Sequence, residues 1–549
     1  MEIIFKNDTT NELGYLASFI FEWLEEKGYK NADDFILNLN FDNSVEDEGY
    51  VYSTKENGAS IDASCLSGLW AGVGHFLFNS QIKEGELLPS KEYYKSIPQK
   101  KIRGLYFASH FHNFYHDAPI NEIRRYVKEL ALWGINALCV WFDMHHYNGI
   151  DDPKASEMVS RLRMILEAAQ VCGMKASIGV LSNEGFATTP DDLKADWRAG
   201  QNGYIREPVG HYHVEICPNV PGGMELILQN REDMCRAFEG IDFEYIWIWP
   251  YDQGGCTCEK CSPWGANGFL KVTPPVAEMC RKYFPNSKII LSLWDFDAFI
   301  EGETDTFKKV FKNENDYVDY ILCETKSGSD EICGLPIVGF PEISMRGAVP
   351  WGGFGANPLP GYIRQIWDDN KSEKQGGFPY SEGIYEDLNK FLMSRMYWNG
   401  DYDIRTAMVE YASAYFSRDC AETIADCLSD MEATLPRYHQ LNGVTLDPYR
   451  YYEPQYVKDG TKFIIYNPAL INSIYERMTE CDAKLHPEAG SSWRWRILYL
   501  RAVIDKELAA NDYNDTETIR AAYRELTEIY YAQGADYVVK PPVSESYAN

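Results

Sequence analysis

The sequence predicts an α/β protein built around a (β/α)8 TIM barrel, with a small α+β domain before it and an all-helical C-terminal domain after it. Two observations lead to this fold class. Eight apolar runs of strand length alternate with amphipathic helical stretches, as a (β/α)8 barrel requires. After Trp398 the strand-like runs stop and long amphipathic helical segments follow. We therefore expect domains at 1–97, 98–400 and 401–549.

The first segment, residues 1–97, has the pattern of a small sheet covered by helices. Strand-like runs at its start and middle flank a stretch of helical period over 11–27, and a hairpin is expected to turn at 56–58. A second helix follows, in which small residues recur every four positions at Ser64, Gly68 and Gly72. Small residues on one face of a helix allow close approach, so we expect this helix to pack tightly on the sheet.

The barrel strands are expected where apolar or alternating runs occur in the middle of the chain. These runs lie at 102–109, 135–142, 174–181, 245–250, 288–294, 319–324, 336–340 and 376–381. A doubly wound sheet is the alternative, but no glycine-rich phosphate loop follows the first run. The helical segments after residue 400 are expected to support the barrel or to mediate homodimerisation.

Composition excludes several classes of partner. The net charge is −30, from 52 Lys and Arg against 82 Asp and Glu, which argues against nucleic acid and against an anionic membrane surface. The N-terminus has no signal-like pattern, and no window has the roughly 18 apolar residues of a membrane span. We expect a cytoplasmic protein, or a periplasmic one if a signal segment preceded this chain, with its 14 cysteines mostly reduced.

Polar side chains follow every predicted barrel strand, and carboxylates follow seven of the eight. In TIM barrels the active site lies at the C-terminal ends of the strands. Paired carboxylates beside aromatic rings suit glycoside hydrolysis, and Trp249, Trp294 and Trp351 could stack on sugar rings. The predicted catalytic residues are Asp252, Glu324 and Glu382. The predicted substrate contacts are His110, His112, Asp143, His146, Tyr251, Gln253, Trp294, Asp295, Glu342 and Tyr380.

Two groups of residues raise the question of a metal. Five histidines lie in the loops after the first two strands, which leaves open a metal-dependent hydrolase or lyase, although hydrogen bonding to sugar hydroxyls explains them more simply. Cys256, Cys258 and Cys261 form a C-x-C-x-x-C segment, and Cys217 is the best fourth candidate. Four thiolates would suit a structural zinc, and free thiols are the alternative. No cofactor is expected in catalysis.

The order of the three domains resembles β-hexosaminidases and α-glucuronidases. The segment D-x-G-G-C-x-C-x-x-C, from Asp252 to Cys261, is similar to one in uncharacterised bacterial proteins and endo-acting N-acetylglucosaminidases. The resemblance implies a glycoside hydrolase of bacterial type, and it covers about residues 1–400.

There is one departure from the family pattern. β-Hexosaminidases place an Asp-Glu pair after the fourth strand, in which the glutamate is the general acid, whereas this chain has Asp252-Gln253. A glutamine cannot donate a proton as a general acid. The acid would therefore be Asp252, Glu324 or Glu382. We expect hydrolysis of oligosaccharides that contain N-acetylhexosamine or uronic acid, and the alternative is an inert carbohydrate-binding barrel.

Overall fold

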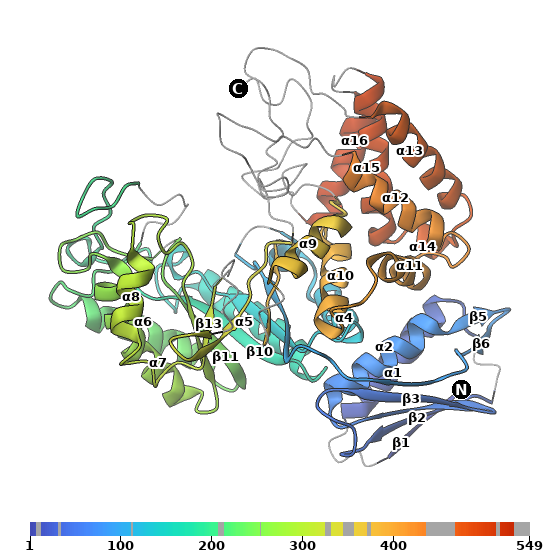
Figure 1. The fold of residues 1–549 in the computed structure, drawn as a ribbon, viewed down its shortest axis with the longest axis horizontal. Coiled ribbons are helices and arrows are strands. Elements are labelled where there is room, and N and C mark those ends of the chain that lie inside the picture. Colours follow the sequence, from blue (N-terminus) through green and yellow to red (C-terminus); the bar gives the residue numbers. More distant parts are fainter. Residues whose placement is uncertain are drawn as a thin grey trace.

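The computed structural model contains a small N-terminal domain, a barrel and a group of C-terminal helices (Figure 1). The residues that it describes are 1–6, 12–30, 34–110, 113–206, 214–252, 254–323, 331–343, 356–370, 375–434, 467–511 and 516–531. Among the described residues, no helix is long and apolar enough to cross a membrane.

The N-terminal domain is a five-stranded sheet with two helices on one face (Figure 1). The strand order is β1-β2-β4-β3-β7, and β3 and β4 form the expected hairpin across residues 56 and 57. Its elements are β1 (Glu2–Lys6), α1 (Glu12–Glu26), β2 (Ile36–Phe41), β3 (Tyr50–Lys55), β4 (Gly58–Ala63), α2 (Leu66–Asn79), the hairpin β5 (Gln81–Lys83) and β6 (Glu86–Leu88), and β7 (Tyr93–Ser96).

Helix α2 packs closely on the sheet, as its small residues predict, and it also packs closely on the barrel. A Cβ on Gly68 would lie 2.6 Å from the Gly49 carbonyl oxygen, and one on Gly72 would lie 2.5 Å from the Ile61 side chain. On another side, a Cβ on Gly74 would lie 1.9 Å from the carbonyl oxygen of Leu132, the last residue of the barrel helix α4 (Ile120–Leu132). Glycine at these positions therefore lets α2 pack closely between the N-terminal sheet and the barrel.

The barrel consists of eight parallel strand positions that close on themselves. Its strands are β8 (Ile102–Phe107), β9 (Ala137–Trp141), β10 (Lys175–Leu181), β11 (Phe243–Trp249), β12 (Lys288–Ser292), β13 (Tyr320–Leu322), β15 (Leu335–Val338), and the short pieces β16 (Gly376–Gly377) and β17 (Tyr380–Ser381), which share the last position. Parallel bridges join Gly339 to Gly377 and Glu342 to Tyr380, so the last position pairs with β15 on one side and β8 on the other. The predicted barrel is thus confirmed.

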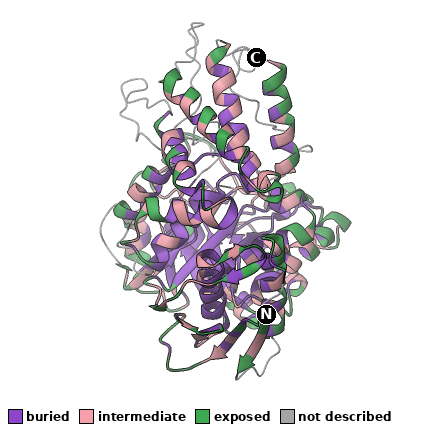
Figure 2. Cartoon of the chain, turned by 90° about the vertical axis from the view of Figure 1, so that its right-hand side faces the viewer, coloured by how far each residue is buried: buried purple, intermediate pink, exposed green. Residues whose placement is uncertain are grey.

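Helices surround the barrel on its outside. They are α3 (Phe114–Asp117), α4 (Ile120–Leu132), α5 (Pro153–Gln170), α6 (Gly223–Ala237), α7 (Leu270–Tyr283), α8 (Glu303–Phe311), α9 (Pro360–Asn370) and α10 (Asp387–Trp398). Between β13 and β15 the described residues contain the short strand β14 (Glu331–Ile332) and no helix. The barrel strands are almost wholly buried, because helices cover their outer face and aromatic side chains fill the interior (Figure 2).

The C-terminal helices pack against the side of the barrel that α4 and α10 form (Figure 1). They are α11 (Ile404–Tyr415), α12 (Ala421–Ala433), α13 (Pro468–Asp482), α14 (Pro487–Gly490), α15 (Trp493–Ala510) and α16 (Glu517–Tyr530). Each of the long helices has a buried and an exposed side (Figure 2). This amphipathic pattern is the one that the sequence predicts after residue 400.

Candidate active site

The C-terminal end of the barrel interior has an aromatic floor. The rings of Trp249 and Trp294 lie 5.7 Å apart between centroids, and Phe340 lies 5.2 Å from Trp249 and 6.0 Å from Trp294. Tyr380 continues the floor at 5.7 Å from Phe340. Trp294 and Tyr380 are only partly buried, so these two residues of the floor keep some solvent-accessible surface. Flat aromatic surfaces of this kind suit the apolar faces of sugar rings.

Asp252 stands at the edge of this floor, directly after β11. The indole N–H of Trp294 donates to Asp252 Oδ1 at 3.3 Å. Burial raises the pKa of Asp252 to about 7, and the Asp295 carboxylate contributes in the same direction. Both aspartates hold a left-handed backbone, with φ of 70° for Asp252 and 60° for Asp295, which costs conformational energy and is typical of functional sites.

A second group of carboxylates lies on the other side of the floor, around Tyr380. The Tyr380 hydroxyl donates to Glu382 Oε1 at 3.0 Å, and Glu342 pairs with Tyr380 through a backbone bridge. Burial, followed by the negative charge of Glu382, raises the pKa of Tyr380 well above its usual range, and Glu342 adds to the effect. The barrel mouth therefore carries carboxylates on β11 and β12 and others on β15 and β17.

A third polar group follows β9 and β10. His145 Nδ1 lies 2.8 Å from Glu184 Oε1, and the His145 backbone N–H donates to the same oxygen at 3.2 Å. The Trp141 indole donates to Asp143 Oδ1. Burial raises the pKa of Asp143, and the charge of Glu184 raises it further. Asp143 Oδ2 and Glu184 Oε2 are buried and have no hydrogen-bond partner among the described residues.

Two further histidines, His110 and His146, lie near His145 of this third group. One ligand atom each from Asp143, His145 and His146 can be chosen so that all three lie within 4.8 Å of one another. Burial holds the pKa of His110 well below its usual range, and the neighbouring His146 and His145 act in the same direction. Glu184 was absent from the predicted site, although it follows the third barrel strand just as Asp143 follows the second. The sequence did carry a signal for Glu184, because the polar residues Asn183 and Glu184 follow the predicted strand at 174–181.

One predicted contact residue, Tyr251, lies away from the site. Tyr251 is fully buried and donates its hydroxyl to Glu303 Oε1 at 2.6 Å. It has no surface for a sugar, so the prediction that it contacts substrate is wrong. Its ring packs away from the floor, against Trp197, Phe296 and Phe299 in the core outside the barrel interior. The predicted residues that lie outside the described part of the chain are His112, Gln253, Glu324 and Trp351.

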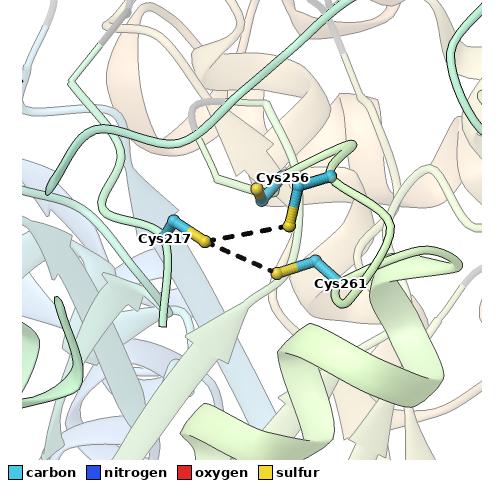
Figure 3. A group of neighbouring side chains, drawn as sticks. Cys217, Cys256 and Cys261 are labelled. Atoms are coloured by element: carbon cyan, nitrogen blue, oxygen red, sulfur yellow. Dashed lines mark hydrogen bonds between the residues drawn. The ribbon is translucent and has the colours of Figure 1, made fainter. Parts of the chain in front are cut away.

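The four cysteines come together outside the barrel mouth. Their sulfur atoms all lie within 4.8 Å of one another, although Cys217 precedes α6 and the other three follow β11. Figure 3 shows Cys217 and Cys261 turned toward one another from separate segments, with Cys256 beside them. All four have free thiols in this structure. Three of the four cysteines, Cys256, Cys258 and Cys261, lie in the loop that follows Asp252.

No protein-family model and no curated protein matches the chain. Solved structures do share its fold. A family 138 glycoside hydrolase that targets pectin rhamnogalacturonan II is 12% identical with a TM-score of 0.60, over 100% of this chain and 77% of that one. The family 89 glycoside hydrolase of Clostridium perfringens, in complex with GlcNAc-α-1,4-galactose, is 13% identical with a TM-score of 0.58, over 95% and 66%.

A family 20 exo-β-N-acetylglucosaminidase from Vibrio harveyi, in complex with N-acetylglucosamine, also shares the fold. It is 13% identical with a TM-score of 0.52, over 78% of this chain and 74% of that one. This chain therefore shares its overall fold with these three glycoside hydrolases.

Proposed function

We propose that this protein is a glycoside hydrolase whose active site is the aromatic-floored mouth of the barrel. The observation that carries the proposal is Asp252, a carboxyl group with a pKa of about 7 beside Trp249 and Trp294. A glycosidase needs one carboxyl group that is protonated near neutral pH and another that stays ionised. Asp252 fits the first role, and fold similarity to three glycoside hydrolase families supports the same conclusion.

In the proposed reaction, Asp252 protonates the oxygen of the leaving group as the glycosidic bond breaks. Glu382, which accepts a hydrogen bond from Tyr380, is the proposed ionised partner, and Glu342 is the alternative on the neighbouring strand. An ionised carboxylate stabilises the oxocarbenium-like transition state, as nucleophile or as base toward water. The ring faces of Trp294 and Tyr380 would hold the sugar between the two groups.

The proposed substrate is an oligosaccharide that contains N-acetylhexosamine or uronic acid. N-Acetylglucosamine is bound in the Vibrio harveyi enzyme, and an N-acetylglucosaminyl-galactose in the Clostridium perfringens enzyme. The pectin rhamnogalacturonan II is the target of the family 138 enzyme. These sugars are ligands or targets of the three similar proteins, and we use them to choose which sugars to test first on this chain.

The experiment that tests this function is a turnover panel. We expect the purified protein to hydrolyse at least one member of a set of aryl glycosides and oligosaccharides bearing N-acetylglucosamine, N-acetylgalactosamine, glucuronic acid or galacturonic acid. Product release is followed by absorbance and by chromatography, and sugar binding by calorimetry. Binding of a sugar without turnover of any substrate would contradict the hydrolase and would identify the protein as a carbohydrate-binding barrel.

A second candidate function is metal-dependent hydrolysis. Asp143, His145 and His146 can place one ligand atom each within 4.8 Å of one another, and the buried Asp143 Oδ2 and Glu184 Oε2 have no hydrogen-bond partner among the described residues. On this hypothesis, His146→Ala removes one equivalent of metal and reduces turnover together with it, and added metal restores turnover in chelator-treated wild type. Full turnover in metal-free protein would contradict it.

A further inference from the structure

We infer that Cys217, Cys256, Cys258 and Cys261 bind one zinc ion that ties the loop after β11 to the segment before α6. The first argument is distance. In a tetrahedral site with Zn–S bonds of about 2.3 Å, neighbouring sulfurs lie about 3.8 Å apart. Cys217 Sγ lies 3.9 Å from Cys258 Sγ and 3.8 Å from Cys261 Sγ, and all four sulfurs lie within 4.8 Å of one another.

The cluster also has the surroundings of a metal site. Cys217, Cys256 and Cys261 are buried, with at most 3% of each residue exposed. The Asn219 side-chain N–H donates to Cys261 Sγ at 3.1 Å, and Lys271 Nζ donates to Asn219 Oδ1 at 2.5 Å. Metal ligands are commonly oriented by such outer hydrogen bonds, and the lysine places a positive charge near a tetrathiolate site that carries a net negative charge.

Alternatives to a metal explain the arrangement less well. A disulfide requires sulfurs about 2.05 Å apart, whereas Cys217 Sγ lies 3.9 Å from Cys258 Sγ and 3.8 Å from Cys261 Sγ, and all four cysteines are free. Separate core thiols would have no reason to converge from two segments. A turn at Cys258 brings the three thiols of the loop together. In this turn the N–H groups of Cys261 and Ser262 both donate to the Cys258 carbonyl at 3.0 Å.

The position of the cluster indicates what the metal does. Asn183, buried at the end of β10, donates to the carbonyls of Ile216 at 2.9 Å and Gly255 at 3.0 Å, and accepts from the Gly255 N–H at 2.9 Å. The residues that it joins are the immediate neighbours of Cys217 and Cys256. The zinc ion would lock the same two segments a second time and so fix the backbone after Asp252. Metal binding itself does not depend on the proposed glycosidase activity.

Metal analysis of purified protein tests the inference. We expect one zinc per chain in the wild type, loss of that zinc in Cys217→Ser and in Cys261→Ser, and retention in Cys172→Ser, a matched variant at a buried cysteine outside the cluster. Cobalt substitution should produce thiolate-to-metal charge-transfer bands and strong d–d bands. We also expect the midpoint of thermal unfolding to fall by about 5 °C when the zinc is removed.

A milder variant keeps the inference testable if the serine variants do not fold. Asn219→Ala should retain zinc but release it to a chromogenic chelator about 10-fold faster, because it removes only an outer hydrogen bond. In the wild type, a mercurial reagent should release one zinc as four thiols react. Wild type without zinc, or a zinc that survives in Cys217→Ser and leaves in His146→Ala, would overturn the proposal. Either result is independent of whether any glycoside is hydrolysed.

Discussion

Replacing Asp252 with asparagine is expected to lower kcat/KM for natural oligosaccharides by about 10²–10⁴-fold, because the variant loses proton donation to the leaving oxygen. Asparagine keeps the size of the side chain and can still meet the Trp294 indole, which lies 3.3 Å from Asp252 Oδ1. It also tolerates the left-handed backbone at this position, where φ is 70°. A loss of activity would therefore report the missing proton rather than a distorted loop.

Substrates with different leaving groups test whether Asp252 acts as the general acid. An aryl glycoside whose phenol is strongly acidic needs little protonation, so Asp252→Asn should retain much more of its activity on that substrate than on an oligosaccharide. Glu382→Gln is the matched control, since loss of the ionised partner should impair both substrates alike. Equal losses on both substrates in Asp252→Asn would contradict the assignment of Asp252 as the acid.

The pH profile gives an independent measurement of the same group. A general acid must be protonated, and the pKa of Asp252 is raised to about 7 by burial. The kcat/KM of the wild type should therefore fall as pH rises through about 7, because that parameter reports the free enzyme. Asp252→Asn should lose this alkaline limb. Activity that instead increases with pH across this range would assign Asp252 as a base or nucleophile.

The second large effect is expected outside the barrel mouth, at a buried charge cluster between the barrel and the C-terminal helices. Asp387, at the start of α10, accepts from the hydroxyls of Tyr126 at 2.7 Å and Tyr411 at 2.6 Å, and from Arg494 Nε at 2.7 Å. Arg494 also pairs with Glu129 at 2.5 Å. The variant Asp387→Ala should reduce the free energy of unfolding by about 3–5 kcal/mol, because it leaves the buried arginine with one carboxylate fewer.

Urea unfolding followed by tryptophan fluorescence measures this effect. Arg405→Ala is the control, since its ion pairs with Glu422 and Asp426 are exposed and should change stability by about 1 kcal/mol or less. The double variant Asp387→Asn with Arg494→Met should recover part of the loss, because it removes both charges. A stability of Asp387→Ala within 1 kcal/mol of the wild type would show that the cluster does not hold the two parts together.

Much of the architecture was predictable from the sequence because it depends on local patterns. The hairpin between β3 and β4, the glycines of α2 that face the sheet, and the apolar runs that became β8 to β12 all express periodicity within a few residues. The position of Asp252 at a strand end could be predicted for the same reason, because it follows the apolar run at 245–250. The short strands β16 and β17 were predicted as one run, although Pro379, which has no backbone N–H to donate to a strand ladder, stands between them.

The sequence by itself determined the barrel, its order of elements and the polar residues at the ends of its strands. Only the tertiary structure decided which of these residues share the barrel mouth. In the folded chain Tyr251 lies in the core and donates to Glu303, whereas the next residue, Asp252, accepts from the Trp294 indole. Glu184 lies within hydrogen-bonding distance of His145. Burial in the folded chain also raises the pKa of Asp252. The physical reason is that burial, charge proximity and side-chain direction arise from contacts between segments distant in the chain, which local periodicity does not encode.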